Sequence, residues 1–463
     1  MPKAHSPKQQ LRADQDSSFH ASLRSSLVEN PWKFLCFVLA AAAIIQAWEN
    51  GGQVACMDYY QFWTIGQVFR QGHDTDLYSN EERQGLGEMM WQKVETRIGT
   101  DANAQGASKH YQAGLKRQIL ETYSTPFLYS VFGICSTGEY DRDQDRFQLF
   151  SLICLVFGMA MLCQLSGYSP AASAIALVFF LAAFGPTASE VSVGNVNRIQ
   201  IALIALFLWL QHRSDRPARY LAAGFVLGLT VLFKPNLLFM ALTLILGWAF
   251  SKQSRKLLWD CAGMAAGVFA GFLFSTAYGG SWRHWLRWAA EMPRLMNEYQ
   301  APVIRGNFAF SKAIEESTGL DAAIVISLLV LASALFILRR FGKAGMNGLS
   351  PIADMRLASL GRLVSLLAVR LAWLHYYLLA VVPILYLLRP AERAQSAGTY
   401  YGHPVLRALA LVATIMVAAN SGRIPIALRP DIGTLALTTS SGALLLMVVT
   451  FLEFSRPLPG SAR

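Results

Sequence analysis

The chain has 463 residues, 54% of them hydrophobic and only 15% charged, and its mean hydropathy is +0.34. This composition, with its many separated apolar runs, excludes an ordinary soluble domain and predicts an all-α polytopic membrane protein. The net charge of +11 is spread over short loops between apolar runs, which is how membrane topology is set, so we expect no nucleic-acid partner.

Residues 1–31 are polar, carry scattered lysines and arginines, and precede the first apolar run without a small-residue cleavage site. This pattern predicts a disordered cytoplasmic tail followed by an uncleaved anchor. The apolar run 32–48 nearly crosses a bilayer core at ~1.5 Å per residue. We expect residues 32–463 to form a single transmembrane domain.

Thirteen apolar runs can be counted, and the basic loops between them predict their orientation. The Lys and Arg groups alternate with pairs of runs, which favours a cytoplasmic position for these loops and for both termini. An even number of spans is then required. Because the run 123–137 is short and begins with Ser-Thr-Pro, we interpret it as a re-entrant segment and expect about 12 transmembrane helices in the inner (plasma) membrane. The runs are 32–48, 123–137, 147–165, 171–188, 199–210, 220–233, 237–250, 257–278, 322–338, 357–369, 374–388, 405–419 and 434–452.

This topology places two long loops, 49–121 and 279–321, outside the membrane. In the first loop Asp58 follows the membrane exit, and apolar residues at helical spacing predict a helix that lies on the membrane surface: Phe62, Ile65 and Phe69. In the second loop the tryptophans and arginines of 282–294 occupy opposite arcs of a helix. They predict another interfacial helix in contact with membrane lipids.

Polar residues stand at the outer ends of several predicted spans, on the same side as Asp58. A charge at bilayer depth costs ~2.5–3.5 kcal/mol on insertion scales, so such residues generally face a cavity and mark function. We expect one outward-opening cavity to gather them: Asn195, Asn197 and Arg198, then Lys234, then Arg305 and Asn307, and finally Trp373 with His375.

Such a set suits the transfer of a sugar from a phosphate-linked donor. Cations stabilise the charge that develops on the leaving phosphate, and Lys234, Arg198 and Arg305 can supply them. A base near the anomeric carbon takes the proton of the acceptor hydroxyl, and Asp58 or His375 fits this role.

Four of these residues also have structural interpretations. Arg198 can be a residue that only sets topology or packs within the protein. Asp58 with Gln61 resembles a helix capping box, in which the carboxylate only caps its own helix. Lys234 at a span end can extend to the interface, and His375 can be a satisfied buried histidine. At this point the sequence leaves these alternatives open.

The ordered motifs of the chain resemble those of glycosyltransferase family 87, the polytopic C-type transferases that use polyprenol-phosphate sugars and include bacterial mannosyltransferases. The resemblance extends from residue 32 to about residue 390. The motifs are Met57-Asp58-Tyr59-Tyr60, Gly72-His73-Asp74-Thr75-Asp76-Leu77-Tyr78, Tyr123-Ser124-Thr125-Pro126, Gly194-Asn195-Val196-Asn197, Gly228 before Lys234-Pro235, Gly306-Asn307, and Trp373-Leu374-His375 before Pro383. Departures from the family pattern are Ser-Thr-Pro for a tandem proline, Asn195 for a glutamine, and Leu374 for an acidic residue.

The resemblance implies a C-type glycosyltransferase fold with its active site on the non-cytoplasmic face. It also implies an inverting transfer that needs no cofactor and is metal-independent or weakly metal-dependent. Asp58 matches the family's proposed general base, and His375 matches the histidine of a late Trp-x-His motif. The predicted substrate-binding residues are Lys234, Asn195, Asn197, Arg198, Arg305, Asn307, Tyr59 and Trp373.

We therefore expect a membrane glycosyltransferase that moves one sugar, mannose or another hexose or pentose, from a polyprenyl-phosphate donor. The expected acceptor is a glycolipid, a polysaccharide or another cell-envelope glycan. The alternative is a multi-span transporter or lipid flippase. Transporters often show inverted repeats with midplane charges in paired broken helices, whereas the polar residues and long loops of this chain gather on one face. That asymmetry favours the transferase.

Overall fold

The protein is described from a computed structural model. The predicted N-terminal tail, the C-terminal end and the motif residues 72–75 lie outside the described residues. The predicted cytoplasmic position of both termini therefore stays a prediction. The described residues are 31–71, 76–213, 216–298, 301–343, 351–390, 404–419 and 431–454.

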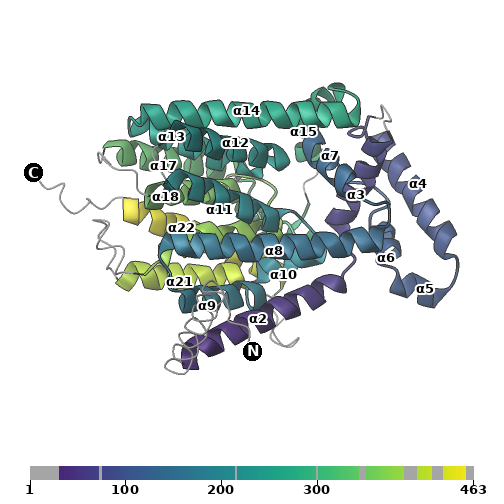
Figure 1. Cartoon of the computed structure of the whole chain (residues 1–463), viewed down its shortest axis with the longest axis horizontal. Helices are drawn as coiled ribbons and strands as arrows, with labels where there is room; N and C mark the ends of the chain where they lie inside the picture. Colours follow the sequence, from purple (N-terminus) through teal and green to yellow (C-terminus); the bar gives the residue numbers. More distant parts are fainter. Residues whose placement is uncertain are drawn as a thin grey trace, which may run out of the picture.

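The regular elements in the described part of the chain are all helices. The β-pairing described there is one isolated antiparallel bridge between Asn307 and Trp373. The first helices after α2 gather at one end of the molecule, at the right in Figure 1, beside the start of α8. The expected outer loop 49–121 therefore forms a compact helical unit. Its helices follow α2 (Pro31–Gly52) and are α3 (Met57–Arg70), α4 (Asn80–Ile98), α5 (Ala102–Ala107) and α6 (Lys109–Lys116).

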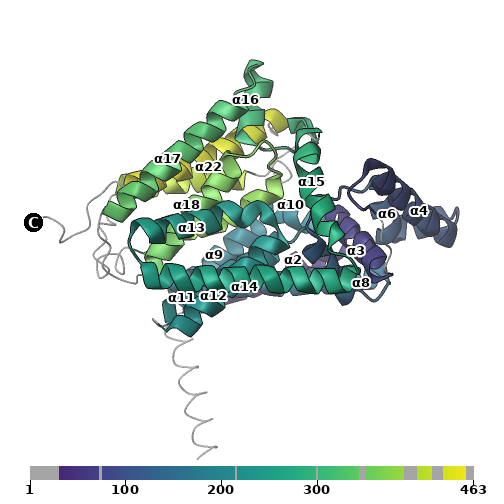
Figure 2. The same ribbon diagram turned by 90° about the horizontal axis from the view of Figure 1, so that it is seen from above.

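The remaining helices form a bundle whose centre is α18, η3 and α19. Nearly every described residue from 353 to 387 in these three elements is buried, so they form the core around which the other helices pack. Figure 2 shows α17 and α22 on one side of this centre and α14 on the other. The elements are α7 (Pro126–Cys135), α8 (Tyr140–Ser166), α9 (Pro170–Ala182), α10 (Gly185–Val193), α11 (Asn197–Arg213), α12 (Pro217–Phe233), η1 (Pro235–Leu237), α13 (Leu238–Phe250), α14 (Ser254–Gly279), α15 (Arg283–Glu298), η2 (Val303–Arg305), α16 (Phe310–Thr318), α17 (Ala323–Lys343), α18 (Pro351–Leu367), η3 (Leu374–Ala380), α19 (Val381–Leu387), α21 (Pro404–Ala418) and α22 (Ile432–Phe454).

Large apolar side chains stand exposed along the outer helices of the bundle. Phe34 on α2, Phe269 on α14 and Leu329 on α17 each expose more than half of their surface. Extended apolar surface on long helices suits contact with lipid hydrocarbon rather than with water. The chain is accordingly a polytopic membrane protein.

The predicted number of about 12 spans is not confirmed by the described residues. Five helices, α2, α8, α14, α17 and α22, are long and apolar enough to cross a membrane, and the pair α9 and α10, bent by 57°, makes up to six. Runs expected at 220–233 and 237–250 became helices α12 and α13, with 17 and 13 residues, whereas a span needs about 20. The broken segment lies at α9 and α10, while α7 in the expected re-entrant run has 10 residues.

Close helix packing holds α12 against α14. A side chain at Gly228 would collide with the backbone carbonyl of Met264, and one at Gly267 would collide with that of Phe225. Small residues therefore let the two backbones approach, as is usual where helices associate within lipid. This contact fixes the end of α12, where Lys234 begins the turn to η1.

The prediction that the helix after Asp58 lies on the membrane surface is wrong. Ten residues of α3 are buried, Phe62 and Phe69 among them. The Phe62 ring lies 5.2 Å from that of Phe132, and the Phe69 ring lies 6.1 Å from that of Tyr129. The apolar face of α3 thus packs on α7 inside the protein, because the helical unit at this end covers it.

The predicted interfacial helix of the second loop is α15, and its apolar residues divide between two environments. Trp285 donates a hydrogen bond from Nε1 to Ser275 Oγ of α14 at 2.9 Å. Trp282 and Leu286 are more than half exposed. One part of α15 is therefore anchored on the bundle, while Leu286 of the helix and Trp282 just before it face the surroundings, as in an interfacial helix.

Candidate active site

A cavity of about 300 Å³ lies between the helical unit at one end and the core of the bundle. Four chain segments that are far apart in the sequence meet there: the start of α3, the turn between α10 and α11, the turn between α12 and η1, and η3. The side chains around it are Asp58, Gln61, Phe62, Glu121, Tyr123, Ser124, Asn195, Lys234, Pro235, Asn236, Phe239, Trp288, Met292, Ser365, Val369, Leu371, Trp373 and Tyr376.

The turn between α10 and α11 brings Asn195 against α3, and Gly194 makes this approach feasible. Gly194 has a φ of +69°, in the left-handed region that favours glycine. A Cβ atom at this position would lie 2.7 Å from the Cβ atom of Cys56 and 2.9 Å from that of Tyr59. The Gly-Asn-Val-Asn motif therefore begins with glycine because both the backbone conformation and the space require it.

Asp58 is the centre of the polar contacts in this cavity. Its Oδ2 accepts a hydrogen bond from Asn195 Nδ2 at 2.6 Å, and its Oδ1 lies 3.6 Å from Arg117 Nη2. His375 Nε2 lies 3.7 Å from Asp58 Oδ2, longer than a hydrogen bond. Burial raises the pKa of the Asp58 carboxyl, although Arg117 and the Asn195 hydrogen bond oppose this shift. A carboxyl group with a raised pKa is a better proton acceptor once it is ionised.

The capping-box interpretation of Asp58 does not describe its contacts. The hydrogen bond that the structure gives the carboxylate comes from Asn195, more than a hundred residues away. Gln61, the expected partner within such a box, instead accepts a hydrogen bond from the backbone N–H of Glu121. Asp58 is thus directed into the cavity by long-range contacts rather than held at the end of its own helix.

Lys234 is buried on the cavity wall, with 7% of its surface exposed. Its Nζ donates a hydrogen bond to Asn195 Oδ1 at 2.6 Å and lies 4.3 Å from the ring centroid of Tyr376. Since the ammonium group points into the protein, the interpretation of Lys234 as a side chain extending to the interface does not hold. A single carboxamide, that of Asn195, therefore joins the Asp58 carboxylate to the Lys234 ammonium.

Behind this wall, Glu190 and Asn197 hold η3 in place. Glu190 accepts hydrogen bonds from the backbone N–H and the Nδ2 of Asn197, both at 2.7 Å. Asn197 Nδ2 also donates to the backbone carbonyl of His375 at 3.0 Å. Arg198 lies beside them and donates to Gln148 Oε1 at 2.6 Å. Asn197 and Arg198 thus support the wall and do not line the cavity.

The other predicted substrate-binding residues take different positions. Trp373 lines the cavity. Asn307 is buried and joins two segments, accepting from the backbone N–H of Ala372 at 3.1 Å and donating to the carbonyl of Ala301 at 3.0 Å. Arg305 is exposed at the end of η2, and Tyr59 stacks on Phe147 with ring centroids 4.7 Å apart. The structure therefore does not bring Arg305, Asn307 or Tyr59 to the cavity.

Sequence reasoning missed four charged residues at this site, of which Glu121 lines the cavity. Arg117, which follows α6, binds Glu121 with Nη1 to Oε1 at 2.6 Å as well as facing Asp58. Glu190 was hidden next to an apolar run, although an acidic residue beside the Gly-Asn-Val-Asn motif is a usable signal. Arg362 lies within the predicted span 357–369. A charged residue within a span is unusual, and this one was a usable signal of function.

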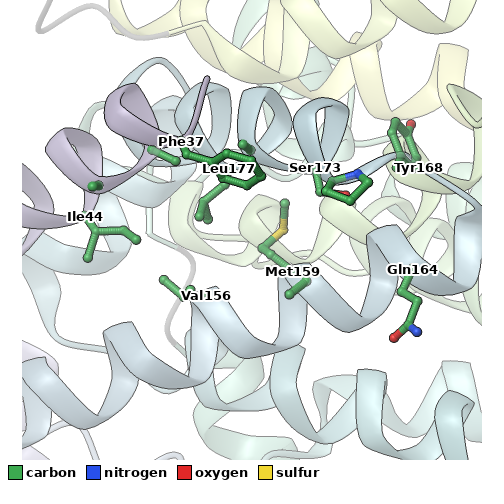
Figure 3. A pocket seen from close by; sticks show the side chains of 13 residues that line it. Phe37, Ile44, Val156, Met159, Gln164, Tyr168, Ser173 and Leu177 are labelled. Carbon is green, nitrogen blue, oxygen red and sulfur yellow. The ribbon is translucent and has the colours of Figure 1, made fainter. Parts of the chain in front are cut away.

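A second hollow lies on the outside of the bundle between α2, α8 and α9, with a volume of about 600 Å³ (Figure 3). Its lining includes Phe37, Met159 and Leu177, and its polar members are Gln164, Tyr168 and Ser173. No acid, lysine, arginine or histidine lies among the residues that line it. The groups needed for acid-base chemistry are therefore at the smaller cavity around Asp58.

Among the residues described, no cluster of three or more His, Cys, Asp or Glu side chains is arranged to hold a metal ion. The independence from metal ions that the sequence suggested stays a prediction. The polar groups at the cavity are instead a carboxylate, an ammonium group and carboxamides, a set that can move a proton and stabilise an anion.

Comparison with known proteins gives one assignment. The sequence model of glycosyltransferase family 87 matches residues 126–369, more than half of the chain. No curated protein and no solved structure matches the chain. The matched region contains Asn195 and Lys234, while Asp58 and His375 lie outside it. The family assignment replaces the transporter or flippase alternative: the chain belongs to glycosyltransferase family 87 and is a membrane glycosyltransferase.

Proposed function

We propose that the protein transfers one sugar, mannose in the first instance, from a polyprenyl-phosphate donor to a glycolipid or cell-envelope glycan acceptor. The reaction takes place in the Asp58 cavity on the non-cytoplasmic face of the inner membrane. One observation carries this proposal: the Asn195 carboxamide holds the Asp58 carboxylate and the Lys234 ammonium group on one wall, each through a hydrogen bond of 2.6 Å. A base and a charge stabiliser are thereby placed in a common frame.

The chemistry needs both groups in the same step. The oxygen of the acceptor hydroxyl attacks the anomeric carbon while its proton passes to the Asp58 carboxylate. The bond between the anomeric carbon and the phosphate oxygen breaks, and its electron pair leaves with the polyprenyl phosphate. Lys234 stabilises the charge that develops on this leaving group. A single displacement of this kind inverts the configuration at the anomeric carbon.

His375 lies behind Asp58, and we assign it a supporting role beside the base. Its Nε2 is buried 3.7 Å from Asp58 Oδ2, and among the described residues this nitrogen has no hydrogen-bond partner. It therefore faces the Asp58 carboxyl group and can hold this group in place for the acceptor hydroxyl. The backbone of His375 is fixed by Asn197, so the distance to Asp58 depends on that contact.

The apolar part of the cavity favours a lipid-linked donor. Phe62, Phe239 and Val369 contribute to its wall, and α15 adds Trp288 and Met292. A hydrophobic wall beside polar groups suits a carrier lipid whose phosphate lies at the polar side. A soluble nucleotide sugar would find few partners for its base and ribose on such a wall.

The test is transfer by the purified protein in lipid nanodiscs. Polyprenyl-phosphate mannose with a glycolipid acceptor should give a product heavier by one hexose, detected by mass spectrometry, and the Asp58→Asn variant should give none. A nucleotide sugar offered in its place should give no product. Transfer from the nucleotide sugar alone would overturn the assignment of the donor, and normal transfer by Asp58→Asn would overturn the assignment of the base.

A further inference from the structure

Arg362 is a buried arginine that has no acidic partner among the residues that the structure describes. It lies on α18 with 1% of its surface exposed. Its Nη1 donates a hydrogen bond to the backbone carbonyl of Asn236 at 2.8 Å, and no carboxylate in the described chain forms an ion pair with it. Its Nε is buried and has no hydrogen-bond partner among the described residues.

Two other buried cations of the bundle each form an ion pair with a carboxylate. Lys256 binds Asp354 through Nζ and Oδ2, and Arg389 Nη2 lies 2.7 Å from Glu453 Oε1. A charge buried without a partner is strongly unfavourable, and within a membrane such a residue generally serves a ligand or a transport path. Arg362 therefore differs from the buried cations that only tie helices together.

The surroundings of Arg362 connect it to the cavity. Asn236, whose carbonyl it holds, lines the cavity and follows Lys234 by two residues. Ser365, one helical turn after Arg362 on α18, also lines the cavity. On its other side the Asn236 side chain accepts a hydrogen bond from Gln200 Nε2 at 2.9 Å. The guanidinium group of Arg362 thus stands directly behind the turn that carries Lys234.

The formal charges of the side chains at the site sum to one positive charge. Four cations and three carboxylates lie at or behind the cavity. The cations are Arg117, Arg198, Lys234 and Arg362, and the carboxylates are Asp58, Glu121 and Glu190. A sugar phosphodiester donor carries one negative charge and would balance this excess. After transfer Asp58 holds a proton, and the phosphate monoester product carries up to two negative charges, so the balance is kept.

We propose that Arg362 is a positioning residue for the donor phosphate. It fixes the Lys234 turn through the Asn236 carbonyl and supplies the positive charge that the phosphodiester neutralises. This inference rests on the proposed function, because it identifies the donor as an anion of one charge. It predicts that Arg362 governs the affinity for the donor and for the phosphate product more than the rate of the chemical step.

The experiment measures donor KM, kcat and inhibition by polyprenyl monophosphate for Arg362→Met and Arg362→Lys in nanodiscs. Arg362→Met should raise the donor KM and the inhibition constant of the product by about 10- to 100-fold, as for a lost interaction with a charged group, with a smaller change in kcat. Arg362→Lys keeps the charge and should stay closer to wild type than to Arg362→Met. The control uses Arg389, the buried arginine that is paired with Glu453. The double variant Arg389→Met, Glu453→Gln removes both charges and should leave the donor KM at the wild-type value.

Two results would overturn the inference. One is an Arg362→Met variant with wild-type donor KM and product inhibition, and the other is an Arg362→Lys variant that binds as weakly as Arg362→Met. If Arg362→Met cannot be purified, Arg362→Lys decides alone, since a tenfold or greater rise in its donor KM contradicts the role of the charge. A wild-type protein that transfers nothing from polyprenyl-phosphate mannose contradicts the proposed function instead, so the two failures are distinguishable.

Discussion

Asn195 donates a hydrogen bond to the carboxylate of Asp58 at 2.6 Å across 137 positions of sequence. The same carboxamide accepts from Lys234 through its oxygen, so its orientation is determined by both neighbours. Because an amide has one donating and one accepting end, this arrangement keeps the Asp58 carboxylate and the Lys234 ammonium group apart while holding both in reach of one substrate.

Replacement of Asp58 by Asn tests the base. The Asn side chain can still accept the hydrogen bond from Asn195, but it cannot take a proton from an acceptor hydroxyl. We expect transfer to fall by ~10²–10⁴-fold, with the melting temperature close to that of wild type. Initial rates and thermal unfolding in the same nanodiscs measure the two effects. An Asn variant with full activity would move the role of base to His375.

The pH profile of transfer reports the raised pKa of Asp58. A base acts only when deprotonated, so kcat/KM should fall as the pH drops through this pKa, at a pH above the usual Asp range near ~3.9. The positive charge of Arg117 lowers the Asp58 pKa, whereas the negative charge of the Glu121 carboxylate raises it. Arg117→Gln should therefore shift the acidic limb to higher pH, and Glu121→Gln should shift it to lower pH. Shifts in the same direction for both variants would contradict Asp58 as the titrating group.

Replacement of Lys234 by Met tests stabilisation of the leaving group. Loss of one preorganised charge stabiliser commonly lowers kcat by about 10²–10³-fold. Methionine keeps most of the volume beside the Tyr376 ring, so the yield of folded protein should change little. The exposed Lys93 on α4 provides the matched control, since Lys93→Met should keep kcat unchanged. A Lys234→Met variant within a few-fold of wild type would restrict Lys234 to a structural role.

Replacement of Gly194 by Ala tests the turn that carries Asn195. Alanine pays a conformational penalty of about 1–2 kcal/mol in the left-handed region, and its Cβ would collide with Cys56. We expect a lower melting temperature together with lost activity. Gly85 on α4 has open space around its Cα, so Gly85→Ala should be neutral or slightly stabilising. Equal behaviour of the two variants would contradict the proposed reason for glycine in the motif.

Cysteine labelling tests the orientation expected from the basic loops. In a background where the exposed Cys135 is replaced by Ser, cysteines at Arg216 and Arg340 should react with a membrane-impermeant maleimide only after the membrane is opened. A cysteine at Gly280 should react in intact cells. The reverse pattern would place the Asp58 cavity on the cytoplasmic side and contradict the proposed face of reaction.

Local patterns predicted the elements of the fold more reliably than the number of spans. Long uniform runs became α8 and α14, and the tryptophan-rich arc became α15. The run 171–188 broke in the middle, and the run 237–250 gave a helix of 13 residues, because burial against other helices makes short segments apolar as effectively as lipid does. Hydropathy alone does not separate these two environments.

The site divides in the same way. Asp58, Asn195, Lys234 and Trp373 were predicted from short motifs at segment ends, and the structure brings all four to one cavity. Arg117 could not be predicted, because it follows a short polar helix and reaches Asp58 only through the tertiary fold. Asn307 was wrongly predicted to bind substrate, because a buried carboxamide that joins two loops and one that binds a substrate have the same pattern in the sequence.

The contact between Asn197 and the carbonyl of His375 spans 178 positions and bears on how the protein is made. Helices enter the membrane in the order in which the ribosome releases them, so Asp58, Glu190 and Asn197 are inserted well before η3 exists. Until η3 arrives, the Asn197 side chain lacks its acceptor on His375, and the cavity lacks the part of its wall that Trp373 and Tyr376 form. We therefore expect chains that stall before residue 375 to be inactive, and the uncovered Asn197 carboxamide to mark them as incomplete for a membrane protease.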